Sequence, residues 1–411
     1  MTASTVSAYR YRWVVLLAFM AVIFVNQILW ITFASITGPA AAFYGVSDLA
    51  IAALSLSFML VYIIVSIPAS WVIDSYGLRA GVGIGAVLTG VFGLLRGFAG
   101  DNYTTVLVTQ LGAAVAQPFL LNAITTVAAR WFLVEERATA SGLGTLAMYA
   151  GQVTALALTP FLVLETSIPA MLMIYGVVAV IGALIFLVFA RERPPTPASA
   201  DGADERALVF DGMKLALRQR DFQLTLLIFF IGLGVFNGVV TWIEDIVRPR
   251  GFTITQAGLV GALLVGAGVL GALILPALSD RKRKRVPYIV LGLVMATVGL
   301  AGITFAGQYG WLLAAAAVMG FFLLAAGPIG FQYGAEITFP APEGTTNGLL
   351  LMIGQVSGIL FILAMDAFKV PLTGSMTPAL LIMIGLMVAG ALLATRLRES
   401  AMISEAAMRD L

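Results

Sequence analysis

Long hydrophobic runs separated by short polar breaks fill almost the whole chain. Twelve of these runs are about as long as a helix that crosses a bilayer, which needs about 20 apolar residues. Lipid offers no water to backbone N–H and C=O groups, so such runs satisfy these groups internally as α-helices. The pattern therefore predicts an all-α membrane protein with spans at 13–37, 49–72, 78–99, 103–128, 138–164, 169–190, 222–246, 256–278, 286–306, 311–335, 344–368 and 378–397.

The polar breaks also divide the chain into two halves. Six runs precede residue 191 and six follow residue 220, with the Pro-rich sequence 193–197 in between. We expect an N-terminal six-helix bundle at 1–190, a cytoplasmic linker at 191–220 and a C-terminal six-helix bundle at 221–411. Within the linker, residues 208–217 alternate apolar and charged residues, which predicts a short amphipathic helix on the membrane surface.

Composition removes several classes of function. The chain has no Cys and no His, so we expect neither a disulfide framework nor a thiolate or imidazole metal site, and no cofactor. The formal charge of +2 gives no indication of nucleic-acid binding. No nucleophile–base pair or metal cluster is apparent, so we expect no enzyme activity. The partners that remain are membrane lipids and a small-molecule substrate.

The basic residues predict an orientation. If the N-terminus is cytoplasmic, 19 of the 23 Lys and Arg residues fall on the inner side and 4 on the outer side. This strong positive-inside bias predicts a multi-pass protein of the plasma or inner membrane with both termini in the cytoplasm. The four on the outer side are Arg96, Arg248, Arg250 and Lys369.

The two halves repeat one polar feature. An Asp ends the second span of each half and an Arg follows five residues later, giving Asp74 with Arg79 and Asp280 with Arg285. A carboxylate at the membrane face can pair with such an Arg and with a helix N-terminus. The repeat indicates duplication and a gating role for these residues, although any tight inner loop can carry an Asp and an Arg. The second copy lies in a run of five basic residues, 281–285, which favours a cytoplasmic electrostatic anchor.

Polar and aromatic residues recur near the middle of several spans. An amide that faces hydrocarbon without a partner costs a few kcal/mol, so we expect these side chains to face the bundle interior. Uncharged amides beside aromatic faces suit a small polar or cationic organic solute, since a cation binds a ring face. The alternative is that they bridge helices, for about 1 kcal/mol each. The candidate substrate-binding residues are Asn26, Trp30, Tyr62, Gln117, Tyr149, Gln152, Asn237 and Gln355.

Acidic residues within the spans lie away from the centre. Glu244 and Asp366 fall near the outer mouth and Glu336 near the inner mouth. Because proton-driven carriers usually need a titratable group in the pathway, this placement favours facilitated diffusion. Glu244 and Asp245 suit a cation-attracting vestibule or an outer gate with Arg248 or Arg250, or are solvated residues at a helix end.

Several motifs resemble known families. Asp74-x-x-Gly77-x-Arg79 and the Arg130-Trp131-Phe132 loop are similar to the inner-loop motifs of the major facilitator superfamily. The stretch 336–361 and the sequence Gln117-Pro118 resemble the branch related to the feline leukaemia virus subgroup C receptor (FLVCR). The first resemblance implies two pseudo-symmetric six-helix bundles that work by alternating access, often as a monomer. The second implies a facilitator of small organic solutes, such as choline and ethanolamine, with haem export proposed for some members.

The FLVCR resemblance also implies site residues. It places Trp30, Gln117, Asn237 and Gln355 around the ligand, with Asn237 where choline-binding members carry an aromatic residue. This change, with Glu244 in the same span, indicates a more polar solute or a primary amine. The alternative function is a proton- or ion-coupled carrier of organic anions or metabolites. That carrier would need an Arg near its site, and Arg96 is the candidate within a span.

Overall fold

The computed structural model describes residues 9–133, 136–194, 209–341 and 343–400. These residues form sixteen α-helices and a short 3-10 helix, with no β-strand among them. The linker residues 195–208 and the basic residue Arg409 lie outside the described residues. The chain divides into unit 1, residues 1–203, and unit 2, residues 204–411, and each unit is described by itself. The division falls within the predicted linker.

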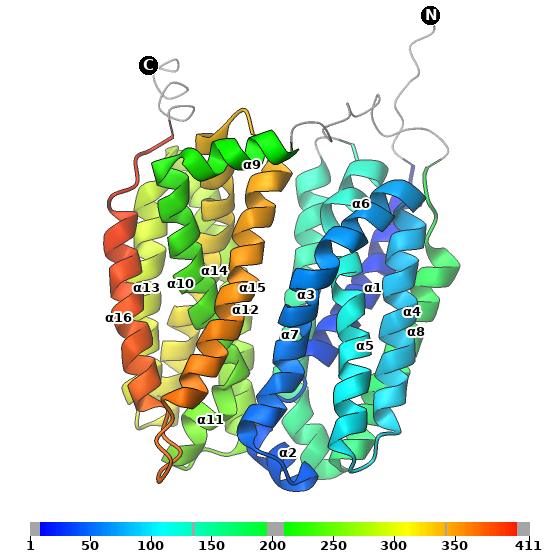
Figure 1. Ribbon diagram of the computed structural model, residues 1–411, viewed down its shortest axis with the longest axis vertical. Helices are drawn as coiled ribbons and strands as arrows, with labels where there is room; N and C mark the ends of the chain where they lie inside the picture. Colours follow the sequence, from blue (N-terminus) through cyan, green and yellow to red (C-terminus); the bar gives the residue numbers. More distant parts are fainter. Residues whose placement is uncertain (1–8, 134–135, 195–208, 342, 401–411) are drawn as a thin grey trace, which may run out of the picture. The chain divides into compact units, whose positions relative to one another are not determined.

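Unit 1 contains the first eight helices, and all six predicted spans are present (Figure 1). Hydroxyl and amide side chains start several of them: Ser47 caps α3, Asn102 caps α5 and Ser167 caps α8. The helices are α1 (Arg12–Ile31), α2 (Thr37–Tyr44), α3 (Asp48–Tyr76), α4 (Leu78–Gly97), α5 (Tyr103–Leu121), α6 (Ile124–Trp131), α7 (Arg137–Glu165) and α8 (Ile168–Phe189).

Unit 2 contains the other eight helices. Its predicted amphipathic helix is present as α9, which lies across the ends of the long helices α10 and α15 (Figure 1). Thr253 and Gln256 form a reciprocal capping box at the start of α12. The helices are α9 (Val209–Arg218), α10 (Arg220–Thr241), α11 (Ile243–Val247), α12 (Ile254–Lys282), α13 (Val286–Phe305), α14 (Tyr309–Thr338), α15 (Glu343–Ala367) and α16 (Thr377–Ala394), with the 3-10 helix η3 (Arg248–Arg250) after α11.

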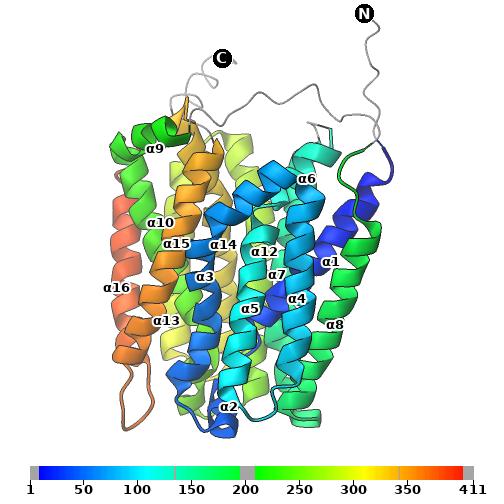
Figure 2. The ribbon, with the colours of Figure 1, turned by 45° about the vertical axis from the view of Figure 1, so that its right-hand side comes forward.

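The two units repeat one packing scheme. In unit 1, α3 packs on α5, α4 on α8, and α1 on α7 (Figure 2). In unit 2, the helices at the same places in the order of spans pack in the same pairs: α12 on α14, α13 on α16, and α10 on α15. The predicted fold class, an all-α membrane protein with twelve spans in two six-helix sets, is confirmed.

The first span of each unit is interrupted, which the hydrophobic pattern does not reveal. The predicted span 13–37 ends as a helix at Ile31 and continues as α2 after a short irregular segment. The predicted span 222–246 ends at Thr241 and continues as α11. Such a break is compatible with membrane depth only where the freed carbonyl groups find donors inside the protein. We call the end of each unit that carries α2 or α11 its far end, and the other its terminal end.

Small residues allow close helix contacts in both units. A Cβ at Gly271 of α12 would collide with the carbonyl oxygen of Phe321 in α14, and one at Gly320 would collide with the carbonyl oxygen of Leu264. In unit 1, a Cβ at Gly151 of α7 would collide with the carbonyl oxygen of Phe24 in α1. Backbones that approach this closely are typical of helix packing in membranes, where apolar burial drives little association.

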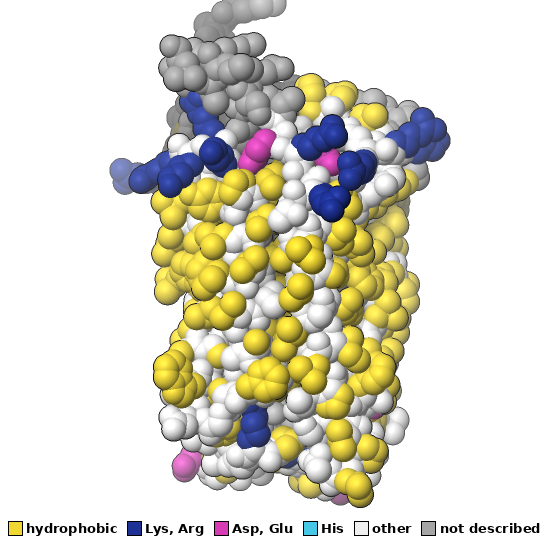
Figure 3. All heavy atoms as spheres, turned by 90° about the vertical axis from the view of Figure 1, so that its left-hand side faces the viewer, with side chains coloured by type: hydrophobic (Ala, Val, Ile, Leu, Met, Phe, Trp, Pro, Cys, Tyr) yellow, Lys and Arg dark blue, Asp and Glu magenta, His cyan; other side chains and the backbone are white. Residues whose placement is uncertain are grey.

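The outward surface agrees with a lipid environment. Among the described residues, twelve helices are long and apolar enough to cross a membrane. Figure 3 shows one face on which hydrophobic side chains cover the middle, while Lys and Arg side chains gather at one end. This division is expected where hydrocarbon meets the aqueous boundary.

Candidate functional site

Asn26 of α1 is fully buried within unit 1. Its Nδ2 donates to Thr89 Oγ1 of α4 at 3.2 Å and reaches the carbonyl oxygen of Ala113 in α5 at 3.5 Å. The residue was a candidate substrate contact. The structure places it where it joins three helices, which is the bridging alternative considered for these amides.

Gln152 of α7 also bridges helices. Its Nε2 donates to Oε1 of Gln27 in α1 at 3.0 Å, and both side chains are almost fully buried. The pair lies beside Gly151, whose missing side chain lets α7 approach α1. The remaining polar atoms, Gln27 Nε2 and Gln152 Oε1, have no partner among the described residues. The bonded atoms, Gln152 Nε2 and Gln27 Oε1, therefore join α7 to α1. The other two polar atoms keep their capacity for further hydrogen bonds.

Trp30 lies at the end of α1 and is held by α3. Its indole Nε1 donates to the carbonyl oxygen of Ser55 at 3.2 Å, and Ser55 Oγ donates to the carbonyl oxygen of Trp30 at 3.4 Å. Because the indole N–H is bonded within the unit, the aromatic ring is the part of Trp30 that remains for a solute. A ring held in this way suits contact with a cation or an apolar group.

Arg96 of α4 supports the same end of α1. Its guanidinium is 1% exposed and donates to the carbonyl oxygen of Leu29 at 3.1 Å, to Gln110 Oε1 at 2.6 Å and to Thr32 Oγ1 at 3.2 Å. Gln110 Nε2 donates in turn to the carbonyl oxygens of Leu29 at 3.0 Å and Leu54 at 3.2 Å. Arg96 and Gln110 thus both donate to the carbonyl group of Leu29 in the last turn of α1, next to the break, and the positive charge lies favourably at a helix C-terminus.

Tyr62 and Gln117 differ in how they are bonded. The Tyr62 hydroxyl donates to Oδ1 of Asn122 at 2.8 Å, and Asn122 Nδ2 donates to the hydroxyls of Ser66 and Ser70 in α3. Gln117 of α5 is 4% exposed, and its amide makes no hydrogen bond with the described residues. Tyr149 of α7 is half-buried. Of the candidate amides in unit 1, Gln117 is thus the one whose donors and acceptor remain available.

In unit 2, Asn237 lies against the helix that carries Gln355. Asn237 Nδ2 of α10 reaches the carbonyl oxygen of Gly354 at 3.5 Å, the outer limit for a hydrogen bond. Gly354 precedes Gln355 in α15, and a Cβ at Gly354 would collide with Leu233 of α10. The Gln355 side chain is half-buried and makes no hydrogen bond with the part of the chain that the structure describes. The close contact at Gly354 therefore packs α10, which carries Asn237, against α15 one residue before Gln355.

A buried ion-pair cluster occupies the far end of unit 2. Arg248 donates to Glu244 Oε2 at 3.2 Å and to Asp245 Oδ1 at 2.6 Å, and Lys369 Nζ donates to Asp245 Oδ1 at 2.8 Å. The side chains of Glu244 and Asp245 are 4% and 0% exposed. The alternative of solvated residues at a helix end is wrong for both, because the fold buries them with cationic partners. The predicted pairing with Arg248 is present.

The pairs predicted at the terminal ends differ between the units. In unit 2, Arg285 pairs with Asp280 as expected, and also with Glu336 at 3.0 Å. In unit 1, no ion pair joins Asp74 to Arg79 among the described residues, and both side chains are exposed. The geometric reason is that another carboxylate, from Glu192, already occupies the start of α4.

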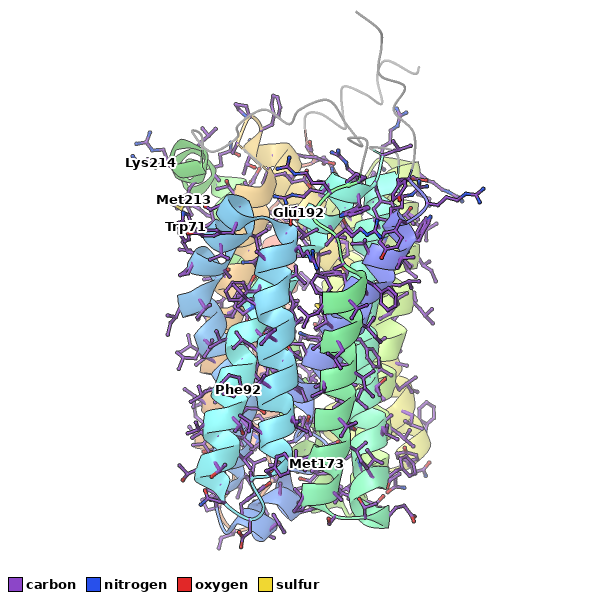
Figure 4. The ribbon with its side chains drawn as sticks, turned by 90° about the vertical axis from the view of Figure 1, so that its right-hand side faces the viewer. Trp71, Phe92, Met173, Glu192, Met213 and Lys214 are labelled. Atoms are coloured by element: carbon purple, nitrogen blue, oxygen red, sulfur yellow. The ribbon has the colours of Figure 1, made fainter. Side chains whose placement is uncertain are left out.

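Glu192 follows α8 and caps α4. Its carboxylate accepts from the backbone N–H groups of Leu78 at 2.9 Å and Arg79 at 2.7 Å, and it pairs with Arg130 (Figure 4). Gly77 allows the Glu192 carboxylate to come this close, because a Cβ at this position would collide with it. Its φ of +98° is also a conformation that favours glycine. A negative charge at this position also stabilises the helix dipole.

Unit 2 contains the equivalent cap. Glu399, after the last span, accepts from the backbone N–H groups of Arg285 at 3.0 Å and Val286 at 3.0 Å. Glu192 and Glu399 are as far apart in sequence as the residues whose N–H groups they accept from, Leu78 and Arg79 in unit 1 and Arg285 and Val286 in unit 2. Together with the repeated packing, this correspondence shows the same arrangement in both units.

The family comparison agrees with this repeat. Residues 15–362 match the model of the Major Facilitator Superfamily. The chain belongs to this superfamily. The resemblance inferred from the inner-loop motifs is therefore confirmed, and with it a multi-pass membrane protein of transporter type.

Several relatives belong to the FLVCR-related branch. Solute carrier family 49 member A3 of Danio rerio is 30% identical over 90% of this chain and 81% of its own length. Choline/ethanolamine transporter FLVCR1 of Felis catus is 31% identical over 86% of this chain and 67% of its own length. Choline/ethanolamine transporter FLVCR2 of Homo sapiens is 29% identical over 87% of this chain and 72% of its own length. The FLVCR resemblance is confirmed as well.

Solved structures show the same fold. A bacterial homologue of the human lysosomal transporter Spinster, in an inward-facing and unoccupied conformation, matches with a TM-score of 0.72 at 17% identity, covering 97% of each chain. The occupied inward-facing form matches with a TM-score of 0.74 at 18% identity, covering 95% of this chain and 98% of that chain. At this identity the likeness concerns the fold of a superfamily transporter.

The site contains residues that the sequence motifs did not reveal. Glu192, Glu399 and Gln110 make many of the hydrogen bonds described above, and none of the three lies in a motif that predicted a site. A signal existed for two of them, because an Arg-Glu pair follows the last span of each half as Arg191-Glu192 and Arg398-Glu399. Among the described residues, no group of three or more His, Cys, Asp or Glu is placed to hold a metal ion.

Proposed function

We propose that this chain is a facilitator that moves a small polar or cationic organic solute across the membrane by alternating access. The candidate binding residues are Trp30 and Gln117 of unit 1 and Asn237 and Gln355 of unit 2. The observation that carries the proposal is the state of two amides, Gln117 and Gln355. Unlike Asn26, they make no hydrogen bond within the described residues, so they can bond a solute without breaking the bundle.

The names of the relatives support the solute class. FLVCR1 and FLVCR2 are named as choline/ethanolamine transporters, and these two solutes are small amines that carry a hydroxyl group. A Trp ring can hold the cation and an amide oxygen can accept from the hydroxyl or from an N–H group. Asn237 adds a hydrogen-bonding group in unit 2, which favours a primary amine such as ethanolamine over a quaternary one.

The charged residues support a facilitator over an ion-coupled anion carrier. Glu244 and Asp245 are held by Arg248 and Lys369 rather than left to titrate in a pathway. Arg96, the candidate for binding an organic anion, is buried and bonded to the end of α1. We further propose that the protein lies in the plasma or inner membrane with both termini cytoplasmic, acts as a monomer, and has no enzyme activity.

Uptake of labelled ethanolamine and choline into cells or proteoliposomes tests the proposal. Gln117→Ala and Gln355→Ala should each lower kcat/KM about tenfold, the loss expected when a bond worth about 1.5 kcal/mol to a charged solute is removed. Asn26→Ala serves as the control, because it should lower thermal stability more than it changes KM. Normal uptake by both Gln variants would remove these residues from the site, and uptake of carboxylates alone would favour the anion carrier.

A further inference from the structure

The last two residues of α12 and the first two of its connection to α13 form a basic segment, residues 281–284, which we call the basic turn. Ser279 is fully buried, and its Oγ donates to the carbonyl oxygen of Lys284 at 2.6 Å. The backbone carbonyl oxygen of Ser279 accepts from the Lys284 N–H at 3.1 Å. Arg283 adopts the left-handed conformation, with φ of 50°, that closes such a helix end. The backbone of the turn is thus fixed, and all four basic side chains are exposed.

The fifth basic residue of the run, Arg285, is buried and interacts with the nearby carboxylates. It pairs with Asp280 and Glu336, while Glu399 accepts from its backbone N–H. Burial lowers the pKa of Arg285, but the hydrogen bonds and charges of Glu336 and Asp280 outweigh it and raise the pKa above its usual value. Within the described residues, no carboxylate pairs with Arg281, Lys282 or Lys284.

The terminal end of unit 2 therefore carries a large excess of positive charge. Besides the buried Arg285, nine Lys and Arg side chains described there are exposed, against five acidic side chains, three of them engaged as above. Figure 3 shows Lys and Arg side chains gathered where the hydrophobic surface ends. The exposed basic residues are Lys214, Arg218, Arg220, Arg281, Lys282, Arg283, Lys284, Arg396 and Arg398, and the acidic ones are Asp221, Asp280, Glu336, Glu343 and Glu399.

Exposed apolar side chains lie directly below the basic turn along the helices that it joins. On α12, Leu273, Ile274 and Leu278 are 64%, 47% and 39% exposed, and on α13 Leu291 is 42% exposed. A ligand that matches both surfaces has an anionic head and apolar chains. We propose that the basic turn binds the phosphate of an anionic phospholipid, whose acyl chains lie along α12 and α13. The backbone of the turn is already fixed before a lipid binds. Binding therefore restricts only the rotamers of the Lys and Arg side chains, which keeps its entropy cost small.

Lipid titration of the purified full-length protein, followed by thermal shift or native mass spectrometry, tests the proposal. Phosphatidylglycerol should bind and stabilise the protein more than phosphatidylcholine, with weaker binding at high salt. The triple variant R281Q/K282Q/K284Q should weaken phosphatidylglycerol binding on the order of 10- to 100-fold, since each basic residue near a membrane surface contributes about tenfold or less. Arg285 is unchanged, so the fold should be retained.

Two matched variants make the result specific to the turn. K214Q/R218Q/R396Q removes the same charge from the same end of unit 2 and should change binding less than about threefold. R281K/K282R/K284R keeps the charge and should bind as the parent does. Equal weakening by both charge-removing variants, equal binding of the two lipids, or competition by millimolar glycerophosphate would each overturn the lipid site. If the triple variant does not fold, Lys282→Gln alone should still weaken binding, and unchanged binding would count against the proposal.

Discussion

The two units bury charge at their far ends in opposite ways. Unit 1 buries a cation, Arg96, whose hydrogen-bond partners are neutral oxygens of α1 and α5. Unit 2 buries an anion, Asp245, which is paired with Arg248 and Lys369. In both units the charge lies where the first span breaks. The repeated fold thus contains the same helix break in both units, and in both the buried charge there has hydrogen-bonding or ionic partners. The residues that supply these partners differ between the units.

At the terminal ends the two units are alike. Glu192 and Glu399 cap the third span of their units through two backbone N–H groups each. The side chains around the caps differ, since Glu192 pairs with Arg130 while unit 2 places Arg285 between Asp280 and Glu336. Backbone geometry is retained more strictly than ion pairing, because a helix start needs acceptors wherever it lies.

The largest effect is expected from Asp245→Asn. It removes the carboxylate that Lys369 and Arg248 share, although Arg248 keeps its pair with Glu244, and breaking one partner of a buried pair costs about 3–5 kcal/mol. The melting temperature of the purified protein should fall steeply. The double variant Asp245→Asn with Lys369→Met should recover part of the loss, and a double variant that shows strictly additive losses would contradict the pairing.

Arg96→Met should cost less than Asp245→Asn, about 2 kcal/mol, even though it removes three hydrogen bonds. The reason is that it removes donors from neutral acceptors, whereas Asp245→Asn removes a carboxylate from two cations, and Gln110 still donates to the carbonyl oxygen of Leu29. Arg96→Lys should fall between the parent and the Met variant. A larger loss for Arg96→Met than for Asp245→Asn would reverse the comparison between the units.

Gly77→Ala should destabilise the terminal end of unit 1 by about 1–2 kcal/mol, the cost of placing a non-glycine residue at this strained φ with a steric collision. The collision is with the Glu192 carboxylate, so the loss should shrink in a Glu192→Ala background. Thermal unfolding of the four proteins in this cycle measures the coupling. Independent, additive losses would show that Glu192 does not approach Gly77.

Glu192→Gln and Glu399→Gln should have the smallest and most similar effects, each about 1 kcal/mol, because a glutamine still accepts one hydrogen bond but loses the charge at the helix dipole. The Arg130 pair adds little for Glu192, since both side chains are partly exposed. Amide hydrogen-exchange rates in the first turns of α4 and α13 measure the effect of each cap on its own helix. A change confined to one unit would break the correspondence between the caps.

The positions along each span were largely predictable, but the direction of each side chain was not. Asn26, Gln117 and Gln152 all fall near the middle of their predicted spans by residue count. In the structure, Asn26 and Gln152 form hydrogen bonds with neighbouring helices, whereas Gln117 forms none with the described residues. Depth follows from helical rise alone, whereas the direction a side chain faces depends on how its helix is rotated against neighbours far away in sequence.

The sequence by itself determined the number of spans, their approximate ends, the division into two halves and the superfamily, because lipid forces long apolar runs into helices and short motifs mark the loops. Only the tertiary structure decided that Glu192 rather than Asp74 caps α4, that Arg96 supports the break after α1, and that Asn237 reaches the carbonyl oxygen of Gly354, next to Gln355. Each of these contacts joins residues that are far apart in sequence. Their formation depends on close packing of backbones, which local hydrophobic pattern does not encode.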